Sequence, residues 1–281
     1  IEERSHHLTF GEFGGKFAKA VTAAPHLAEP SVASSEPNTH PPIEAVDGVD
    51  AYALPHNETS TGVMVDLVRP DDPDALVLVD ATSAAGGLRF DAEATDVYYF
   101  APQKALAADG GLWIAMVSPA AVDRIERIAA SGRWCPPSLD LKIALDNSRK
   151  DQTYNTPALA TIFLAADTVR WFNDNGGLAW SAGRSDRSAE IMYGWADERD
   201  FVTPFVPDPA ERSRVVATLD FDDAIDADQL VEILRANGIV DTGGYRKLGR
   251  NQLRIGLFPA IEPDDVEALT TCLDHVVEAL S

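Results

Sequence analysis

Short apolar runs, separated by turns rich in glycine, proline and polar residues, dominate the first half of the chain. The runs at residues 51–54, 75–79, 97–101 and 112–117 are almost continuously apolar. Such runs are typical of strands that are covered on both faces, as in an α/β sheet. The links between them are short for full crossover helices, so some neighbouring strands could be antiparallel or joined by loops. We therefore predict an α/β fold with a mainly parallel sheet.

Other stretches of this half follow simple patterns. Residues 6–10 are expected to form a short strand, and residues 11–24 have the apolar spacing of a helix. Residues 25–48 are rich in proline, serine, glutamate and asparagine and are expected to be a loop. A helix is predicted over 120–130, because Ser118-Pro119 is a suitable start.

A long amphipathic helix is predicted over residues 156–173. Asn155 and Thr156 would be its N-cap and first residue, with Pro157 in the first turn. The Asn-Gly-Gly sequence at 175–177 would end it in the left-handed conformation, and a further helix is expected over 178–195.

The last part of the chain has the element order of a separate small α/β unit. We expect strands at 213–221, near 239–241 and at 252–258, and helices at 227–237 and 262–280. We therefore predict two domains, a large one over residues 1–175 and a small C-terminal one over 176–281.

Charge narrows the possible functions. The chain has 45 acidic and 23 basic residues, which gives a formal net charge of −22. Such a surface repels phosphate backbones and anionic lipid, so nucleic-acid and membrane-surface binding are not expected. It does not exclude a small anionic ligand that a few arginines hold.

Metal and export signals are also weak. Only two cysteines occur, Cys135 and Cys272, which cannot form a disulfide framework or a Cys-x-x-Cys zinc site. The acidic cluster at 220–228 lacks the order of an EF-hand loop. No apolar run is long enough to cross a bilayer, and no leader is recognisable, so we expect a cytoplasmic protein with no metal.

Polar residues follow three of the apolar runs at the point where each ends. The run at 51–54 is followed by Thr59, the run at 75–79 by Asp80 and Thr82, and the run at 97–101 by Gln103 and Lys104. In open α/β sheets, ligands bind at the carboxyl ends of strands. These three segments would therefore deliver a hydroxyl, a carboxylate and an amine to one edge of the sheet.

Asp80 and Lys104 fit two interpretations. A lysine that forms a Schiff base, together with an aspartate that pairs with a pyridinium nitrogen, is the pattern of a pyridoxal phosphate site. The ordinary alternative is a carboxylate that caps a strand end and a solvated lysine. Spacing alone leaves both interpretations open.

A set of motifs decides between them. The chain resembles the phosphoserine aminotransferase family, most closely its actinobacterial form, within the class V group of fold-type I pyridoxal phosphate transferases. The resemblance extends over essentially the whole chain, and its motifs lie at residues 8–13, 56–62, 79–83, 99–104, 109–113, 152–158 and 237–254.

The resemblance implies a role for each of several residues. Lys104 would bind pyridoxal 5′-phosphate as a Schiff base and later move a proton between substrate and cofactor. Asp80 would keep the pyridine nitrogen protonated. Phe13 would stack on the cofactor ring, although a helix residue packed in the core is its plainer interpretation. Thr59 would bind near the phenolic oxygen of the cofactor.

The family also implies a shared site in a homodimer. Thr82 and Gln103 would bind the cofactor phosphate, and Asn155 and Thr156 would reach the same phosphate from the neighbouring subunit. A helix N-terminus is a suitable anion site, so a capping role and a binding role for these two residues are compatible.

Two arginines are implied for the substrates. Arg254 would bind the substrate α-carboxylate in a bidentate geometry that lysine cannot reproduce. Arg246 is the candidate for the substrate phosphate, although its loop could equally be a solvated turn. The implied reaction passes the amino group of glutamate to 3-phosphohydroxypyruvate, giving O-phosphoserine and 2-oxoglutarate in serine biosynthesis, and the family is also associated with pyridoxine biosynthesis.

Two alternatives remain. The chain could be another class V aminotransferase, of the alanine–glyoxylate or serine–pyruvate type. It could also be a non-catalytic remnant, because it opens at Ile1 in mid-pattern, and relatives carry upstream a glycine-rich phosphate turn and a further arginine. On that basis we expect this chain alone to fold poorly or to bind cofactor weakly.

Overall fold

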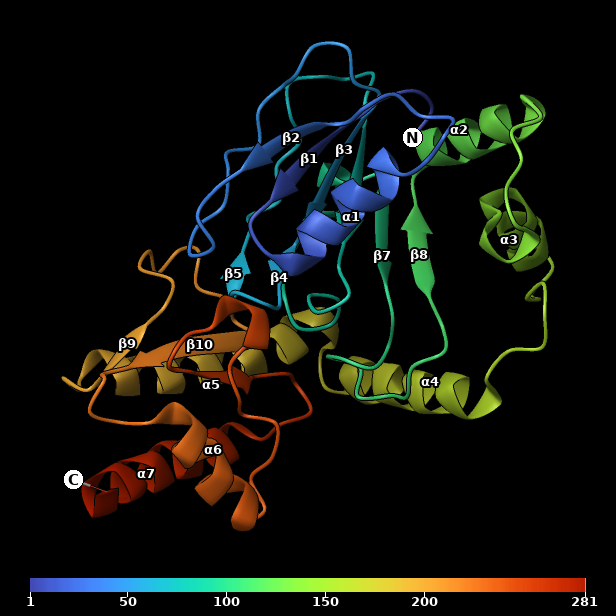
Figure 1. The fold of residues 1–281 in the computed structure, drawn as a ribbon. Coiled ribbons are helices and arrows are strands. Elements are labelled where there is room, and N and C mark those ends of the chain that lie inside the picture. Colours follow the sequence, from blue (N-terminus) through green and yellow to red (C-terminus); the bar gives the residue numbers. More distant parts are fainter. Residues whose placement is uncertain (281) are drawn as a thin grey trace.

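A mainly parallel sheet forms the centre of the larger part of the molecule (Figure 1). A computed structural model describes residues 1–280, and within them this sheet has six strands in the order β2-β1-β3-β6-β7-β8. Every neighbouring pair is parallel except β7 and β8, which confirms the predicted sheet type. Its strands are β1 (Ser5–Thr9), β2 (Ser31–Ser34), β3 (Ala51–Pro55), β6 (Leu76–Asp80), β7 (Val97–Phe100) and β8 (Ile114–Val117).

Helix α1 (Glu12–Thr22) follows β1 and packs on the sheet (Figure 1). Its buried positions, Gly14, Ala18 and Val21, are spaced at three and four residues, so one narrow face of small side chains meets the strands. A hairpin of β4 (Asn57–Glu58) and β5 (Val63–Met64) follows β3 directly.

Three helices lie on the β8 side of the sheet (Figure 1). Helix α2 (Pro119–Ala130) begins as predicted, because the Ser118 hydroxyl accepts a hydrogen bond from the Ala121 amide at 3.1 Å. It is followed by α3 (Leu141–Ser148) and α4 (Leu159–Asp174). Gly176 then takes the left-handed conformation, with φ of 119°, as expected from the Asn-Gly-Gly sequence.

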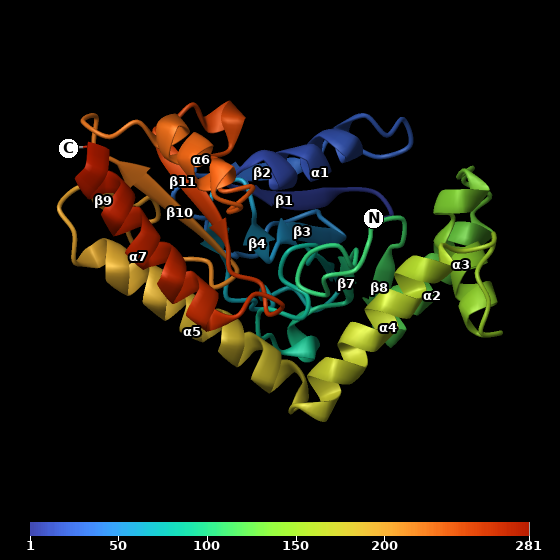
Figure 2. The same cartoon turned by 90° about the horizontal axis from the view of Figure 1, so that it is seen from below.

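The C-terminal part has an antiparallel sheet in the order β11-β10-β9. Its elements are α5 (Gly177–Asp197), β9 (Val202–Pro204), β10 (Val216–Phe221), α6 (Ala227–Ala236), β11 (Gln252–Gly256) and α7 (Pro263–Leu280). Figure 2 shows α5 and α7 side by side along this part of the molecule. Three short 3₁₀ turns complete the chain, η1 (Ala92–Ala94), η2 (Pro137–Leu139) and η3 (Arg246–Leu248).

Two hydrophobic clusters hold these parts together. One includes Leu8, Leu54 and Val79 of the parallel sheet, and the other includes Leu219, Leu253 and Leu273 of the C-terminal part. Full burial of each such side chain stabilises the fold by about 1.5–3 kcal/mol. Strand β10 connects the clusters, because its first residue, Val216, belongs to the first cluster and the rest of its apolar residues to the second.

Three predicted elements are wrong in detail. Residues 25–48 are not all loop, because 31–34 form the edge strand β2. The helix expected from Thr156 begins at Leu159 and has Ala158 as its N-cap, so Asn155 does not cap it. No strand forms near 239–241, because Asp241 has φ of 61°, which a strand does not permit.

Candidate functional site

A cleft of about 750 Å³ separates the carboxyl edge of the parallel sheet from the C-terminal part. Thr59 and Lys104 line it from the sheet side. Arg254 of β11, the segment 238–242 and Leu269 of α7 line it from the other. Two of the predicted cofactor contacts and one predicted substrate contact therefore meet in one cleft.

Lys104 lies four residues after the end of β7, in a turn that is closed by a hydrogen bond from the Ala107 amide to the Lys104 carbonyl at 2.9 Å. Burial lowers the pKa of its ammonium group, and the positive charge of Arg254 lowers it further. Both effects disfavour the charged form, so more of the amine is neutral and nucleophilic at neutral pH.

Asp80 ends β6 and pairs in register with Tyr99 of β7. Its Oδ1 accepts a hydrogen bond from the Thr82 amide at 2.9 Å. The Tyr99 hydroxyl also bonds to this carboxylate, and burial together with the negative charge of Asp80 raises the pKa of Tyr99. A tyrosine that stays protonated is a donor, so Tyr99 orients the carboxylate of Asp80.

Phe13 and Thr59 are linked through Glu58, because the Phe13 amide donates to Glu58 Oε2 at 3.0 Å and Thr59 follows Glu58 in the chain. Thr59 is buried, and its carbonyl accepts a hydrogen bond from Arg254 Nη1 at 3.3 Å. Phe13 is half-buried rather than packed in the core, and its ring centroid lies 6.3 Å from that of Tyr245. The Lys16 ammonium lies 5.2 Å from the Phe13 ring centroid.

The two predicted substrate arginines differ in their surroundings. The Arg254 guanidinium lies 5.5 Å from the Tyr245 ring centroid, and burial lowers its pKa. Within residues 1–280, no carboxylate pairs with it. Arg246 is exposed in η3, next to Lys247, whose ammonium pairs with Glu12 of α1. Arg254 is thus fixed inside the cleft, and Arg246 lies on a turn that is tethered to α1.

The remaining predicted residues do not line the cleft that contains Lys104. Thr82 is half-buried and Gln103 is exposed, and neither lines the cleft described above. Asn155 and Thr156 are exposed and line a separate hollow of about 640 Å³ within the segment 148–162. This chain therefore does not bring these two residues to its own Lys104.

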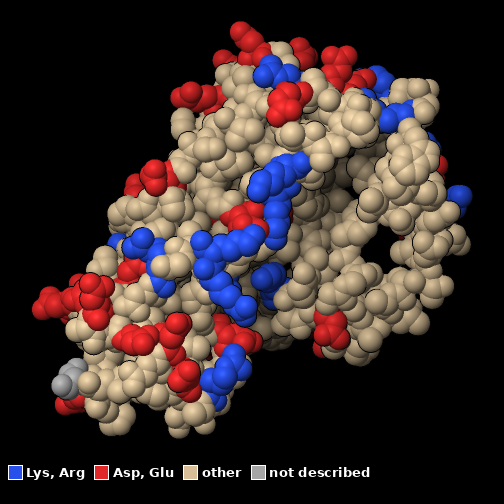
Figure 3. Space-filling view, viewed as in Figure 1, with Lys and Arg blue, Asp and Glu red and all other residues tan. Residues whose placement is uncertain are grey.

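Charge is unevenly distributed over the surface. Figure 3 shows lysine and arginine side chains in a band across the middle of one face, while acidic side chains gather mainly above and below it. A local excess of positive charge on a protein with a net charge of −22 favours the approach of small anions to this region.

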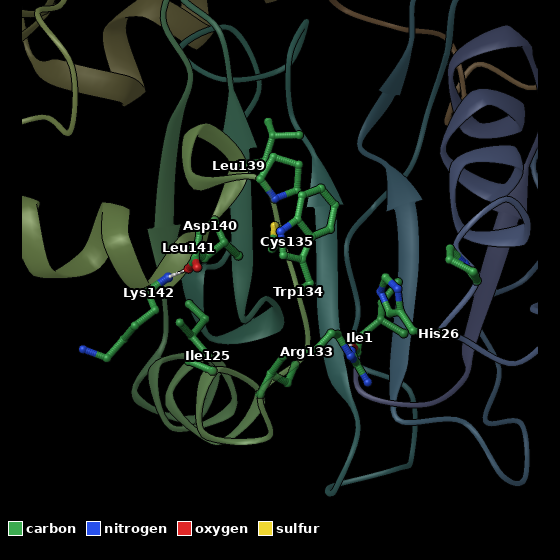
Figure 4. Close-up of a pocket in the computed structure, with 14 residues that line it drawn as sticks. Ile1, His26, Ile125, Arg133, Trp134, Cys135, Leu139, Asp140, Leu141 and Lys142 are labelled. Atoms are coloured by element: carbon green, nitrogen blue, oxygen red, sulfur yellow. Dashed lines mark hydrogen bonds between the residues drawn. The ribbon is translucent and has the colours of Figure 1, made fainter.

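A second cavity, of about 360 Å³, lies by Ile1 (Figure 4). Trp134, Leu139 and Ile125 contribute much of its lining, and Arg133, Cys135 and Lys142 lie around it. It adjoins the amino end of β1, away from the carboxyl edge of the sheet, and contains none of the predicted site residues.

Residues 1–280 contain neither a candidate membrane span nor a candidate metal site. No helix in this range is long and apolar enough to cross a membrane. No group of three or more histidine, cysteine or acidic residues in the same range is placed to hold a metal ion.

Glu58, Tyr99 and Tyr245 have contacts at the site but no role predicted from the sequence. Each lies within one of the motifs that carry the family resemblance, but its partner is distant in sequence. Tyr99 is recognisable from strand pairing with Asp80, whereas Glu58 and Tyr245 could be found only from the structure.

Known proteins of one family are similar to this chain. The family model of class V aminotransferases matches residues 45–269. The chain is 58% identical over 283 residues to a phosphoserine aminotransferase of a Nocardioides species, covering 100% of this chain and 76% of that relative. It is 57% identical to a putative phosphoserine aminotransferase of Mycolicibacterium paratuberculosis, covering 100% of this chain and 75% of that relative.

Solved structures show the same fold. The phosphoserine aminotransferase of Cytophaga hutchinsonii matches with a TM-score of 0.89 at 21% identity, covering 98% of this chain and 77% of that chain. An alanine–glyoxylate aminotransferase from a Nostoc species matches with a TM-score of 0.80 at 20% identity, covering 99% and 76%. At such low identity these likenesses establish the fold alone.

The proximity of Lys104 and Arg254 gives a testable expectation. In Arg254→Met, the pKa of Lys104 should rise, because one of the two effects that disfavour its charged form is removed. The rate at which an amine-acylating reagent modifies Lys104 at pH 8 should therefore fall, measured by peptide mass spectrometry. The exposed Lys19 in the same samples is the reference. An unchanged modification rate at Lys104, relative to Lys19, would contradict the electrostatic coupling.

Proposed function

The chain belongs to the phosphoserine aminotransferases, a family of class V aminotransferases, and from this premise we propose which residues carry out the reaction. We propose that it holds pyridoxal 5′-phosphate on Lys104 and transfers the amino group of glutamate to 3-phosphohydroxypyruvate. The observation that carries the proposal is the meeting of Lys104, Thr59 and Arg254 in one cleft.

The residues present fit this cofactor. The desolvated amine of Lys104 is suited to attack a carbonyl carbon. The half-buried ring of Phe13 offers a flat apolar surface, and Thr59 supplies a hydroxyl that lines the cleft. When bound, pyridoxal phosphate supplies an electron-accepting ring and a carbonyl that takes up and returns the amino group.

Each residue then has a definite task. Lys104 Nζ takes the proton from the substrate Cα and returns it during transfer, as a general base and acid with a lowered pKa. Asp80, oriented by Tyr99 and the Thr82 amide, keeps a proton on the ring nitrogen. Thr82 and Gln103 are proposed to bind the cofactor phosphate.

Arginine is the suitable residue for both substrates, because each carries a carboxylate and a second acidic group. Arg254 is proposed to bind the α-carboxylate that glutamate and 3-phosphohydroxypyruvate share. The first half-reaction releases 2-oxoglutarate, and the second releases O-phosphoserine. Arg246, on the exposed turn above the cleft, is proposed to bind the substrate phosphate. A cytoplasmic location and a part in pyridoxine biosynthesis belong to the same proposal.

A homodimer would complete the site. Helix α4 buries only Thr161, Ala165 and Phe172 and exposes a broad apolar surface that includes Leu159 and Phe163. An exposed apolar surface of this kind is typical of a protein–protein interface. We propose that a second copy covers it, so that Asn155 and Thr156 of the partner subunit reach the cofactor phosphate.

Absorption spectra test the cofactor assignment. After pyridoxal phosphate is added and the excess removed, the unmodified chain should show the visible band of lysine-bound cofactor, and Lys104→Ala should not. Glutamate should discharge the band, because the amino group moves to the cofactor. Absence of a band in the unmodified chain even at saturating cofactor would overturn the proposal for this chain and favour the non-catalytic remnant, whereas weak binding alone agrees with the expectation from the sequence.

Arg246→Met distinguishes the phosphorylated substrate from the small acids of other class V aminotransferases. The KM for 3-phosphohydroxypyruvate should rise by about thirtyfold or more, because a charge-assisted contact worth about 2 kcal/mol is lost. The glutamate half-reaction and cofactor binding should stay within about twofold. Arg250→Met is the matched control, since Arg250 pairs with Asp220. Equal kinetics in Arg246→Met and Arg250→Met would contradict a phosphate-binding role.

Phe163→Asp tests the dimer. A charge in the centre of the proposed interface should raise the dimer dissociation constant by about thirtyfold or more, measured by analytical ultracentrifugation. Val68→Asp places the same charge at another exposed apolar position and should leave the dimer intact. A monomeric unmodified chain, or equal association of the two variants, would refute the interface.

A further inference from the structure

A buried carboxylate lies behind the cleft, and the reaction scheme above does not use it. Glu58, in β4, has 0% relative exposure. Its Oε2 accepts hydrogen bonds from the Phe13 amide at 3.0 Å and the Gly14 amide at 2.9 Å. Its Oε1 accepts from the Ser60 amide at 3.2 Å and the Ser60 hydroxyl at 2.5 Å. A buried charge requires this density of donors.

These bonds give α1 its N-terminal cap. The N-cap residue of α1 is Gly11, which has no side chain to accept the free amides of the first turn. A Cβ at Gly11 would lie 2.4 Å from Glu58 Cγ, so the glycine leaves room for a carboxylate from outside the helix. Ser60 Oγ accepts from the Glu12 amide at 3.0 Å and completes the set.

The carboxylate therefore joins the two segments that carry proposed cofactor contacts. Phe13 is held directly through its amide, and Thr59 is the next residue after Glu58 in the chain. Arg254 is attached to the same tip, because its Nη1 donates to the Thr59 carbonyl. The Glu58 carboxylate thus fixes the positions of Phe13, the Thr59 hydroxyl and the Thr59 carbonyl that binds Arg254 relative to one another.

Burial raises the pKa of Glu58, while the donors from Ser60, Gly14 and Phe13 act in the opposite direction. All four hydrogen bonds to Glu58 come from donors, and an ionised carboxylate can accept all of them because both of its oxygens are acceptors. In Glu58→Gln, the side-chain NH₂ group would face backbone or hydroxyl donors in place of a carboxylate oxygen. The substitution therefore removes hydrogen bonds to Glu58 without changing the size of the side chain.

We propose that Glu58 is a positioning residue for cofactor binding: its carboxylate caps α1 from the hairpin and holds the Phe13 backbone and the Thr59 segment in fixed relative positions for the cofactor. The proposal rests on the proposed function. A plain structural role would lower the stability of the protein but leave the binding geometry of the folded fraction unchanged.

The test compares Glu58→Gln with Asp96→Asn in the full chain. Asp96 is also a buried carboxylate that holds backbone and side-chain donors, including the Val77 amide at 2.9 Å, but it lies at the amino end of β7, away from the cleft. Three quantities are measured for each: the unfolding temperature, the dissociation constant of pyridoxal phosphate, and the circular dichroism of the bound cofactor, which reports the orientation of its ring. Hydrogen exchange of the Phe13 and Gly14 amides is followed in the cofactor-free protein.

Glu58→Gln should weaken cofactor binding by about tenfold or more and alter the dichroism of the bound cofactor, because small displacements of binding groups are costly. Asp96→Asn should lower the unfolding temperature with the dissociation constant and dichroism unchanged. Exchange of the Phe13 and Gly14 amides should accelerate only in Glu58→Gln.

Other outcomes have distinct meanings. If Glu58→Gln unfolds, Ser60→Ala gives a milder test, because it removes one bond to Glu58 and one to Glu12, and it should change the same dichroism in the same direction. Unchanged dichroism and affinity in a folded variant would overturn the positioning role. Failure of the unmodified chain to bind cofactor would instead overturn the proposed function, and the exchange measurement would still decide whether Glu58 caps α1.

Discussion

Parallel pairing of β3, β6 and β7 is the constraint on which the candidate site depends. The register aligns Pro55 with Asp80 and Asp80 with Tyr99, so the segments that follow the three strands leave the sheet at the same edge. Each of these segments carries polar side chains that the strands themselves could not hold in their apolar surroundings. Thr59 and Lys104 line one cleft for this reason, although 45 residues separate them in the chain, and Asp80 ends its strand at the same edge of the sheet.

The electrostatics of the cleft favour an anionic ligand. Lys104 and Arg254 are both partly buried, and each loses part of its preference for the charged form. Within the described residues neither has a carboxylate partner, while most other arginines of the chain pair with acidic side chains. A partly buried arginine without a carboxylate partner is unfavourable for the fold, so a carboxylate or phosphate that binds beside Arg254 would offset this cost. The cleft that holds Lys104 and Arg254 differs in charge from the rest of the chain, which has a formal net charge of −22.

The sequence predicted what depends on local patterns. The apolar runs identified β3, β6, β7 and β8 to within two residues, and the polar residues at their ends indicated Asp80 and Lys104 as candidates. The start of α4 was missed, because Thr156 precedes a proline and is thereby disfavoured from helical geometry, which moves the helix start beyond Pro157. Edge strand β2 was missed because Ser-Val-Ala-Ser has no apolar run and alternates only weakly. The cap that Glu58 gives to α1 could not be predicted, since it joins residues 44 and 45 positions apart.

The position of Arg254 relative to Lys104 depends on how closely β10 approaches the hairpin. Thr218 of β10 pairs with Arg254 in β11, and the Thr218 hydroxyl donates to the Thr61 carbonyl at 2.8 Å. Gly62 permits this approach, because its φ is +76° and a Cβ there would lie 2.6 Å from the Thr218 hydroxyl. The antiparallel sheet is therefore attached at the same tip that Glu58 attaches to α1. The segment 56–62, which has the sequence of a polar turn, thus joins α1, the parallel sheet and Arg254, and the geometry of the cleft follows from these contacts.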